Sequence, residues 1–370
     1  MTHRELPPEG YYSTFKEWLN TTSLRKRKHR KRKHFNDPVD LSEPLGLESP
    51  TFWTLRFSEA RDPYRQRNGI IDIMPKGRIC GAKPDVLSPD HKLIWEHSRE
   101  MHKDPQKHSI FELQKLPPLT YTDDIVALLS SKDSHIYYHW MFDVLPRIYL
   151  MHKRGILADK YVINGKRLAP FQYETLQALG IRRSQIIESH DELHLQARKL
   201  IMPHFTSGIR PQWVCEFLRK KLMIQPKLAP IPGYKRIYIS RANARKRKLL
   251  NEPEVIRLLQ KYGFRSVSLE TMPVSQQIQI FSGAEAVVAP HGAGLTNIVF
   301  SPPGIKVIEM LSPQLVHNCY PILSSHMKHQ HYYLIGEGER PPEYIDPHDH
   351  KADIRVNLNE LHRLLKMARL

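Results

Sequence analysis

The stretch APHGAGLTN, residues 289–297, combines a histidine with two closely spaced glycines. The run EAVVA, 285–289, precedes it, and residues 298–300 continue it with apolar side chains. This pattern predicts a strand, a glycine turn and the start of a helix. Glycines can take positive φ and let a ligand approach the backbone, and the free N–H groups at a helix start attract anions. The turn therefore suits a phosphate group, although a tight connection with no ligand fits the same pattern.

Polar side chains around this turn could add to anion binding. His291 can donate a hydrogen bond whether protonated or neutral, although a buried histidine bonded to backbone carbonyls is the alternative. Thr296 and Asn297 offer donors in the first helical turn. Asn297 stands where the third glycine of G-x-G-x-x-G would be, and no Lys-Ser/Thr pair follows, so neither the dinucleotide fingerprint nor a P-loop is complete. Glu309 ends the next expected strand, where a carboxylate can bind ribose hydroxyls or serve as an ordinary strand-end acid.

A second cluster is rich in arginine and follows an expected strand over 236–240. That strand would deliver Arg241 to its C-terminal edge, where open α/β sheets bind ligands. Arg245 and Arg247 follow in the loop. Guanidinium groups bind phosphate bidentately and stay charged. We expect Arg241 to bind phosphate, whereas a solvated basic loop is the alternative and is the interpretation we prefer for the neighbouring lysines.

The third cluster is HIYYHWMFDVLPR, residues 135–147. In a helix, His139 and Asp143 would share one face at i and i+4. A carboxylate beside an imidazole raises its basicity and fixes its tautomer, which makes a workable general base. An aromatic core helix with one surface ion pair is the alternative, and Pro146 would disturb the helix. Three aromatic side chains here could line a sugar or nucleobase pocket: Tyr138, Trp140 and Phe142.

Alternating strand-like and helix-like segments beyond about residue 76 must position these clusters, and they predict parallel sheets covered by helices. Strands are expected at 125–129, 160–163, 185–188, 199–202, 236–240, 265–269, 286–289, 305–310 and 332–335. Helices are expected at 136–154, 171–179, 211–223, 253–262, 274–281 and 320–328.

Composition divides the chain into five segments. Residues 1–75 are basic and irregular, and 76–224 form a first α/β domain. The segment 225–233 holds three prolines and a glycine, which is typical of a linker. A second α/β domain spans 234–340 and a tail or helix spans 341–370. Two such domains would enclose a cleft, a common place for a ligand.

The net charge of +18 on 370 residues is concentrated near the N-terminus. Residues 25–33 hold eight Lys or Arg and no acid, so we expect a disordered or loosely helical tail. Such a tail can bind an anionic membrane or a polyanion, although a merely solvated tail is the alternative. No motif for specific nucleic-acid recognition accompanies it.

Other features indicate location. The sequence shows no apolar run of about 18 residues and no N-terminal signal. The three cysteines, Cys80, Cys215 and Cys319, lack metal or C-x-x-C spacing, and an odd number fits a reducing compartment. We therefore expect a cytoplasmic protein, with peripheral binding at the inner membrane face through residues 25–33 as one option.

Three blocks together resemble glycosyltransferase family 61, which includes plant arabinosyl- and xylosyltransferases and animal protein O-GlcNAc transferases. The blocks, in order, are YYHWMFDVLPRIYL, RIYISRANARKRKLLNE and VVAPHGAGLTNIVFSPPGIKVIEM. The resemblance suggests a bacterial-type member. It implies a GT-B-like α/β fold, in which two Rossmann-like domains face a cleft. It also implies a nucleotide-sugar donor, typically a UDP-sugar, bound by the C-terminal domain, and inversion at the anomeric carbon.

The resemblance implies roles for single residues. Arg241 and Arg245 would neutralise the diphosphate, and Glu309 would meet the ribose. His139 and Asp143 would face the acceptor, with Asp143 the first choice as base and His139 the second. The turn that holds the diphosphate consists of His291, Gly292, Ala293, Gly294, Leu295, Thr296 and Asn297.

No metal cofactor is expected. Inverting transfer needs a base for the acceptor proton and positive charge for the leaving nucleoside diphosphate. The donor half lacks a DxD triad with an acidic cluster, so arginines, His291 and helix N–H groups would replace a metal. The segment DPHDH, 346–350, could bind a metal by composition but lies outside the resemblance.

The acceptor would be a glycan or a lipid-linked glycan in polysaccharide biosynthesis, because the chain shows none of the anchors, signals or disulfides of secretory members. A non-catalytic nucleotide- or polyanion-binding protein that uses the basic tail is the main alternative. A nicotinamide- or methyl-donor-dependent Rossmann enzyme is disfavoured by Asn297 in place of the third glycine and by the arginine loop.

Overall fold

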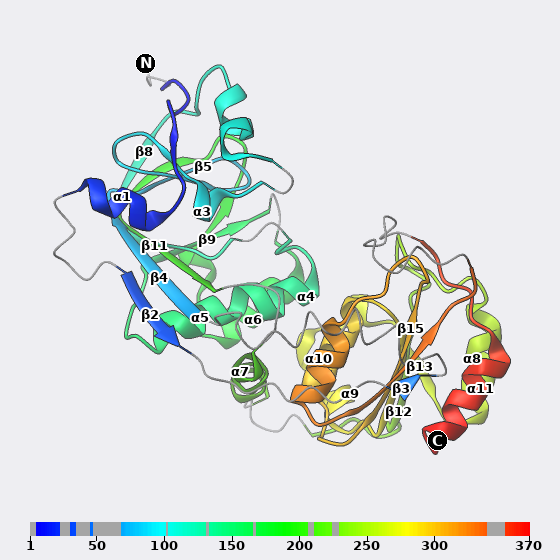
Figure 1. The fold of residues 1–370 in the computed structure, drawn as a ribbon. Helices are drawn as coiled ribbons and strands as arrows, with labels where there is room; N and C mark the ends of the chain where they lie inside the picture. Colours follow the sequence, from blue (N-terminus) through cyan, green and yellow to red (C-terminus); the bar gives the residue numbers. More distant parts are fainter. Residues whose placement is uncertain are drawn as a thin grey trace. The chain divides into compact units, whose positions relative to one another are not determined.

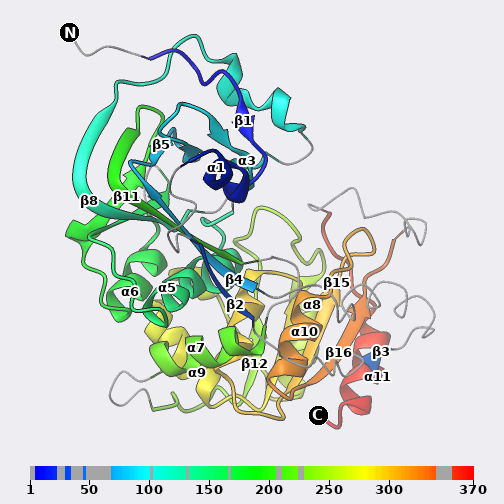
Figure 2. The same ribbon diagram turned by 60° about the vertical axis from the view of Figure 1, so that its left-hand side comes forward.

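The computed structural model describes residues 5–22, 30–34, 45–46, 68–100, 103–130, 133–165, 168–205, 211–223, 229–338 and 352–370. The chain forms two compact units, each an α/β arrangement of a sheet and helices (Figures 1 and 2). Unit 1 comprises Met1–Asn36 and Gln66–Thr206, and unit 2 comprises Asp37–Arg65 and Ser207–Leu370. The α/β class is therefore confirmed. The segment 346–350 lies outside the described residues, as do 25–29 of the basic block.

Unit 1 is built on a mixed sheet rather than a wholly parallel one. The order is β1-β7-β6-β5-β11-β8-β9-β10, and β4 pairs with both β11 and β2. The pairs β11–β8, β8–β9 and β9–β10 are parallel. Strands β4 and β5 each pair antiparallel with β11, and β5 also pairs antiparallel with β6 through a short connection. The strands are β1 Tyr11–Tyr12, β2 Arg30–His34, β4 Asn68–Pro75, β5 Arg78–Cys80, β6 Asp85–Leu87, β7 Leu93–Ile94, β8 Thr120–Leu128, β9 Lys160–Asn164, β10 Ile186–Ser189 and β11 His194–Phe205.

The helices of unit 1 include α1 Phe15–Thr21, α3 Trp95–Ser98, α4 Tyr137–His139, α5 Leu145–His152 and α6 Pro170–Ala178, with short 3-10 turns η3 Pro105–Lys107, η4 Ser109–Glu112 and η6 Arg183–Gln185. The helix expected over 136–154 is present but not regular. A π-helical turn, η5 Trp140–Val144, joins α4 to α5 just before Pro146. Proline cannot donate the regular backbone bond, so the widened turn is a local response to it. The aromatic residues expected to line a pocket, Trp140 and Phe142, are fully buried in the core.

The N-terminal segment belongs to the fold of unit 1, although its composition suggested an irregular region. Strand β1 extends the sheet beside β7, and α1 buries Phe15 and Trp18 in the core beneath it. The basic block also contributes, because residues 30–33 lie in β2, which pairs antiparallel with β4. The expectation of a disordered or helical tail is wrong for these residues.

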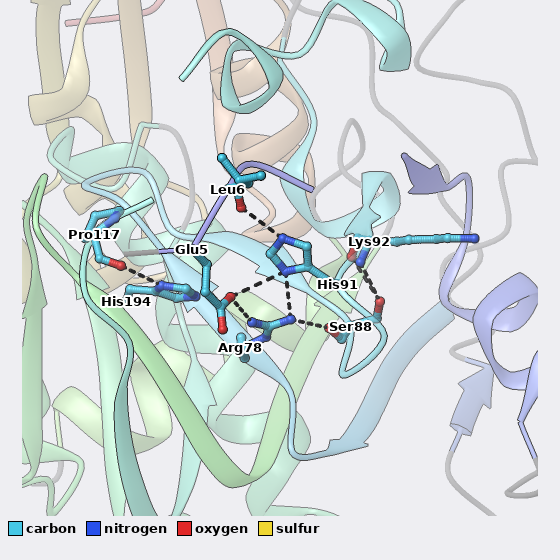
Figure 3. A network of polar contacts seen from close by, with 8 residues as sticks. All are labelled: Glu5, Leu6, Arg78, Ser88, His91, Lys92, Pro117 and His194. Carbon is cyan, nitrogen blue, oxygen red and sulfur yellow. Dashed lines mark hydrogen bonds and ion pairs between the residues drawn. The ribbon is translucent and has the colours of Figure 1, made fainter. Parts of the chain in front are cut away.

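A buried arginine fixes the first residues of this segment (Figure 3). Arg78 donates to the Glu5 carboxylate over 2.6 Å, to the Ser88 carbonyl over 3.3 Å and to His91 Nδ1 over 2.9 Å. A guanidinium can only donate, so His91 Nδ1 accepts and its proton sits on Nε2. That Nε2–H donates to the Leu6 carbonyl over 2.9 Å. The network therefore holds the chain end against the sheet through one ion pair and one histidine tautomer.

Unit 2 has a parallel six-stranded sheet in the order β13-β12-β14-β15-β16-β3. Its strands are β3 Leu45–Gly46, β12 Arg236–Ile239, β13 Arg265–Val267, β14 Ala286–Pro290, β15 Lys306–Leu311 and β16 Gln330–Ile335. Its helices are α7 Gln212–Leu222, α8 Glu252–Lys261, α9 Val274–Ser282, α10 Cys319–His326 and α11 Leu358–Met367, with 3-10 helices η7 Leu269–Thr271 and η8 Ala293–Phe300. The strands and helices expected in this half are confirmed.

A short strand from the N-terminal part of the sequence and a helix near its C-terminal end complete unit 2. Strand β3 adds to the sheet edge beside β16, where a Cβ on Gly46 would lie within 2.0 Å of the Tyr333 ring. Helix α11 packs against α8 and buries Leu361, Leu364 and Leu365 completely. The C-terminal segment, expected to be a tail or a helix, thus contributes a helix to the core, because its apolar residues recur at i, i+3 and i+4.

No helix among the described residues has the length and apolar composition needed to cross a membrane. The three cysteines are buried and unpaired with one another in the structure, so no disulfide links them.

The packing of α11 predicts a large effect of truncating one buried leucine. Leu364→Ala should lower the free energy of unfolding of unit 2 by about 2–5 kcal/mol, because the fully buried side chain leaves a cavity. Urea unfolding measures the change. The exposed neighbour substitution Lys366→Ala should change it by less than about 0.5 kcal/mol. Equal stability of Leu364→Ala and the parent chain would contradict a core role for α11.

Candidate functional site

The glycine turn after β14 and the loop after β12 meet at the C-terminal edge of the unit 2 sheet. Arg241 follows β12 and lies over Gly292, such that a Cβ on Gly292 would be 2.0 Å from Arg241 Nη1. Arg241 Nη2 donates to the Lys246 carbonyl over 2.8 Å, and Nε donates to the Arg247 carbonyl over 3.2 Å. Two residues predicted from separate motifs are therefore in contact. Gly292 is required because any side chain there would displace the guanidinium.

Gly292 and Gly294 do not use positive φ, contrary to the expectation for the turn. Gly292 has a φ of 171°, which is extended backbone open to any residue. A Cβ on Gly294 would lie 3.0 Å from Ile239 and 3.2 Å from Leu269. Both glycines are needed for close packing and not for a left-handed conformation.

A second arginine reaches the turn from the same loop. Arg247 has a left-handed φ of 54°, and its Nε donates to the His291 carbonyl over 3.3 Å. Arg245, which the resemblance singled out, is exposed in the loop. The turn is also held from the other side, because the Tyr320 hydroxyl on α10 donates to the Gly292 carbonyl over 2.6 Å. No sequence motif indicated that Tyr320 would contact the turn. Arg247 was one of several basic residues in its loop, and nothing in the sequence distinguished it from the others.

The two arginines, both half-buried, create a region of positive charge. Burial lowers the pKa of Arg241, and the nearby Arg247 guanidinium lowers it further. Burial likewise lowers the pKa of Arg247. Among the described residues, Arg241 forms no ion pair with a carboxylate, and its hydrogen bonds go to backbone carbonyls. Two guanidinium groups that disfavour each other in a desolvated place are suited to an anionic ligand.

The helix after the turn is the 3-10 helix η8, and most of its side chains face the core. Ala293 is half-buried, whereas Leu295, Thr296 and Asn297 are fully buried. The Asn297 amide donates to Gln277 Oε1 over 2.8 Å and to the Gly294 carbonyl over 3.2 Å. Asn297 thus stabilises η8, in contrast to the role expected for it in ligand binding. At the other end, Arg219 donates to the Val299 and Ser301 carbonyls over 2.7 and 2.8 Å.

Glu309 is fully buried and holds two histidines, so it does not present its carboxylate to a ligand. His291 Nδ1 donates to Oε1 over 2.5 Å, and His331 Nε2 donates to Oε2 over 3.1 Å. Burial alone would raise the pKa of the Glu309 carboxyl, but the hydrogen bonds from His291 and His331 outweigh it and lower the pKa to about 2. Glu309 therefore does not make the expected ribose contact and instead positions the His291 ring. With its Nδ1 proton donated to Glu309, the His291 ring has Nε2 as its other polar atom.

The third cluster keeps its expected geometry through the π-helical turn. His139 Nδ1 lies 2.6 Å from Asp143 Oδ2, with the His139 side chain 32% exposed and the Asp143 side chain 15% exposed. A carboxylate accepts, so Nδ1 carries the proton and Nε2 presents its lone pair. Arg147 donates to the Asp143 carbonyl over 2.9 Å and to the Ser130 carbonyl over 2.5 Å. Burial lowers the pKa of Arg147 to about 10, although the Asp143 carboxylate opposes that change.

The Glu309 cluster predicts a dependence of stability on pH. The folded-state pKa of about 2 lies below the ordinary value of 4.5, so the carboxylate stabilises the fold above about pH 4.5. This contribution, on the order of 3 kcal/mol, is lost as the pH falls toward about 2. Glu309→Gln should therefore be less stable than the parent at neutral pH, and the difference should shrink at about pH 3.

Urea unfolding at both pH values measures this difference, with the half-exposed Glu254→Gln on α8 as the control that leaves stability nearly unchanged. A gap between the parent and Glu309→Gln that stays constant across this pH range would contradict the depressed pKa.

Comparison with known proteins agrees with the three sequence blocks. Residues 137–308 match the family model of Glycosyltransferase 61. Over 112 residues the chain is 32% identical to the EGF domain-specific O-linked N-acetylglucosamine transferase of Drosophila melanogaster, a stretch covering 30% of this chain and 21% of that protein. Over 67 residues it is 42% identical to the Protein O-linked-mannose beta-1,4-N-acetylglucosaminyltransferase 2 of Takifugu rubripes, covering 17% of this chain and 11% of that protein.

The chain thus spans about a fifth or less of the length of these relatives. The assignment to a bacterial-type subgroup stays a prediction. The match includes His139 and Asp143 as well as the arginine loop, the glycine turn and the first half of β15, and it ends just before Glu309. Residues 137–308 are therefore similar to those of glycosyltransferases, and the match to the family 61 model covers just under half of the chain.

Proposed function

We propose that the chain transfers a sugar from a nucleotide-sugar donor, with a UDP-sugar favoured, to a glycan or lipid-linked glycan acceptor. The observation that carries the proposal is the contact between Arg241 and Gly292 beside Arg247. It combines two guanidinium groups with a backbone turn at the C-terminal edge of a parallel sheet, where α/β domains bind nucleotides. The diphosphate of the donor would lie against these groups.

The arginines serve the chemistry as well as the binding. Transfer leaves a nucleoside diphosphate with increased negative charge, and fixed positive groups at that place lower the barrier. Within unit 2, the described residues include no cluster of three side chains able to hold a metal ion. Arg241 and Arg247 would supply the positive charge directly, and Nε2 of His291 would add a hydrogen bond when the ring carries both protons.

His139 is the base in this proposal, with Asp143 as the residue that orients it. The order of the two is reversed from the expectation based on the resemblance, because His139 Nδ1 is bonded to Asp143 and its Nε2 remains to accept a proton. The acceptor hydroxyl would lose its proton to Nε2 while its oxygen attacks the anomeric carbon and the nucleoside diphosphate leaves. A single direct displacement of this kind inverts that carbon.

The names of the two relatives indicate which sugar to test first. Both relatives are named as N-acetylglucosamine transferases, so N-acetylglucosamine is the first sugar to test. Their named acceptors belong to those proteins, and polysaccharide synthesis, a cytoplasmic location and membrane binding through residues 25–33 remain predictions for this chain.

The donor site is tested by titrating the purified full chain with UDP, GDP, ADP and NAD in a calorimeter, in the presence of EDTA. One nucleoside diphosphate, UDP first, should bind. Arg241→Ala should weaken that binding by roughly 10- to 100-fold, because it removes a charge-assisted hydrogen bond to phosphate. Gly292→Ala should have a similar effect, since its Cβ would force the Arg241 guanidinium away.

The exposed Arg245 of the same loop supplies the matched control. Arg245→Ala should change the affinity by less than about threefold. Binding that survives Arg241→Ala but is lost in Arg245→Ala would contradict the placement of the diphosphate. Binding of heparin with no binding of any nucleotide would favour a polyanion-binding protein instead.

The base is tested through turnover. His139→Ala should lower kcat by roughly 10²- to 10⁴-fold and leave UDP affinity unchanged, because proton removal occurs at the acceptor. Asp143→Asn should lower kcat less and shift its pH profile. Transfer from UDP-N-acetylglucosamine to water or to an acceptor panel measures the rate, with the exposed His135→Ala as control. Full activity of His139→Ala would overturn its role.

A further inference from the structure

Three ligand-type side chains converge in unit 1, and none of them has a role in the function proposed above. Asp72 lies on β4, His97 on α3 and His204 near the end of β11. His97 Nε2 is 3.0 Å from Asp72 Oδ2, and His204 Nε2 is 3.2 Å from the same oxygen. One atom from each residue lies within 4.8 Å of the other two. This is a convergence of two imidazole nitrogens and one carboxylate oxygen.

The fold fixes two of these residues relative to each other. In the antiparallel pair of β4 and β11, Asp72 lies opposite Met202. Residues two apart on a strand share a face, so His204 is the diagonal neighbour of Asp72 on the face that also carries Met202. Strand β2 pairs with β4 on its other side at Asp72, so this position is held between two strands.

The third residue comes from a different element. Helix α3 follows β7, and it places His97 with its ring 4.7 Å from the His204 ring, nearly perpendicular to it. The ring of Phe15 packs against the His97 ring at 6.4 Å. The imidazole orientations are therefore set by packing, as a binding site for a metal requires.

The separations fit ligands around one ion. Zinc lies about 2.0–2.1 Å from histidine nitrogen and about 2.0–2.2 Å from carboxylate oxygen. Two such ligands at angles between square and tetrahedral are roughly 3.0–3.4 Å apart. The distances from Asp72 Oδ2 to the two nitrogens, 3.0 and 3.2 Å, fall within this range. The two imidazole nitrogens lie within 4.8 Å of each other.

Burial and charge favour a cation of the transition series. The Asp72 side chain is fully buried, the His97 side chain is 6% exposed and the His204 side chain is 21% exposed. Imidazole nitrogens with one carboxylate select zinc and related divalent ions over magnesium or calcium, which prefer oxygen. The partial exposure of His204 gives an ion a route from solvent and leaves room for water as a further ligand.

We propose that Asp72, His97 and His204 bind a divalent transition-metal ion, with Zn²⁺ as the first candidate, and that the ion links β4, α3 and β11. Without the ion, each Nε2–H donates to Asp72. On binding, the proton of each ring moves to Nδ1 and both Nε2 lone pairs coordinate the ion. The site goes beyond glycosyl transfer, and its residues are separate from those proposed for the nucleotide.

The test uses the full chain stripped with EDTA and then freed of chelator. Zn²⁺ is titrated in a calorimeter, and Co²⁺ serves as a spectroscopic probe of nitrogen and oxygen coordination. Zn²⁺ should bind in a single tight step and raise the melting temperature. His97→Ala and His204→Ala should each weaken binding by at least about 100-fold, because losing a residue that merely holds a ligand already costs roughly 10- to 100-fold.

Controls separate this site from other histidines and from misfolding. The exposed His190→Ala in the same unit should bind Zn²⁺ as the parent does. His204→Ala is the least disruptive variant, and its unchanged near-ultraviolet circular dichroism would show that it folds. Parent binding that persists in both histidine variants, or absence of micromolar Zn²⁺ binding by the parent, would overturn the site. UDP binding is measured on the same samples, so failure of the metal site is distinguishable from failure of the donor site.

Discussion

The C-terminal edge of the unit 2 sheet depends on one constraint, the absence of a side chain at Gly292. The Arg241 guanidinium occupies the volume where a Cβ of residue 292 would be. The loop that follows Arg241 folds back, and two of its backbone carbonyls accept hydrogen bonds from the guanidinium. Arg247 adopts a left-handed backbone in that loop. Because carbonyls and not carboxylates hold Arg241, its positive charge is fixed in place but not neutralised. A preorganised cation of this kind can bind an anion without losing an existing ion pair.

Carboxylates orient histidines in both units. Glu309 fixes the Nδ1 proton of His291, and Asp143 does the same for His139. In each pair the carboxylate accepts from Nδ1, which fixes the ring orientation and leaves Nε2 as the other polar atom. Glu309 was expected at a strand end suited to a ribose contact, but it lies within β15 between β14 and β16 and is fully buried.

The sequence predicted the elements of unit 2 well, because its apolar strands alternate with amphipathic helices over short intervals. It also predicted the pairing of Arg241 with the glycine turn and of His139 with Asp143, since these depend on local spacing and on the shared edge of parallel strands. It missed Tyr320, His331 and the place of Arg247, which depend on packing between distant elements. The cluster of Asp72, His97 and His204 could not be predicted from the sequence either, because its members are separated by 25 and 107 positions along the chain.

Strand β3 has a consequence for how this protein can be divided. Residues 37–65 leave unit 1 to complete unit 2, and the chain then returns to unit 1 before residue 207. Gly46 allows the strand to lie against Tyr333 at the border of the sheet. Excising 207–370 as a separate module would leave the backbone of β16 open along that border, a template for intermolecular strand pairing. The two units are thus interleaved along the chain, because a strand of unit 2 lies between the two sequence segments of unit 1.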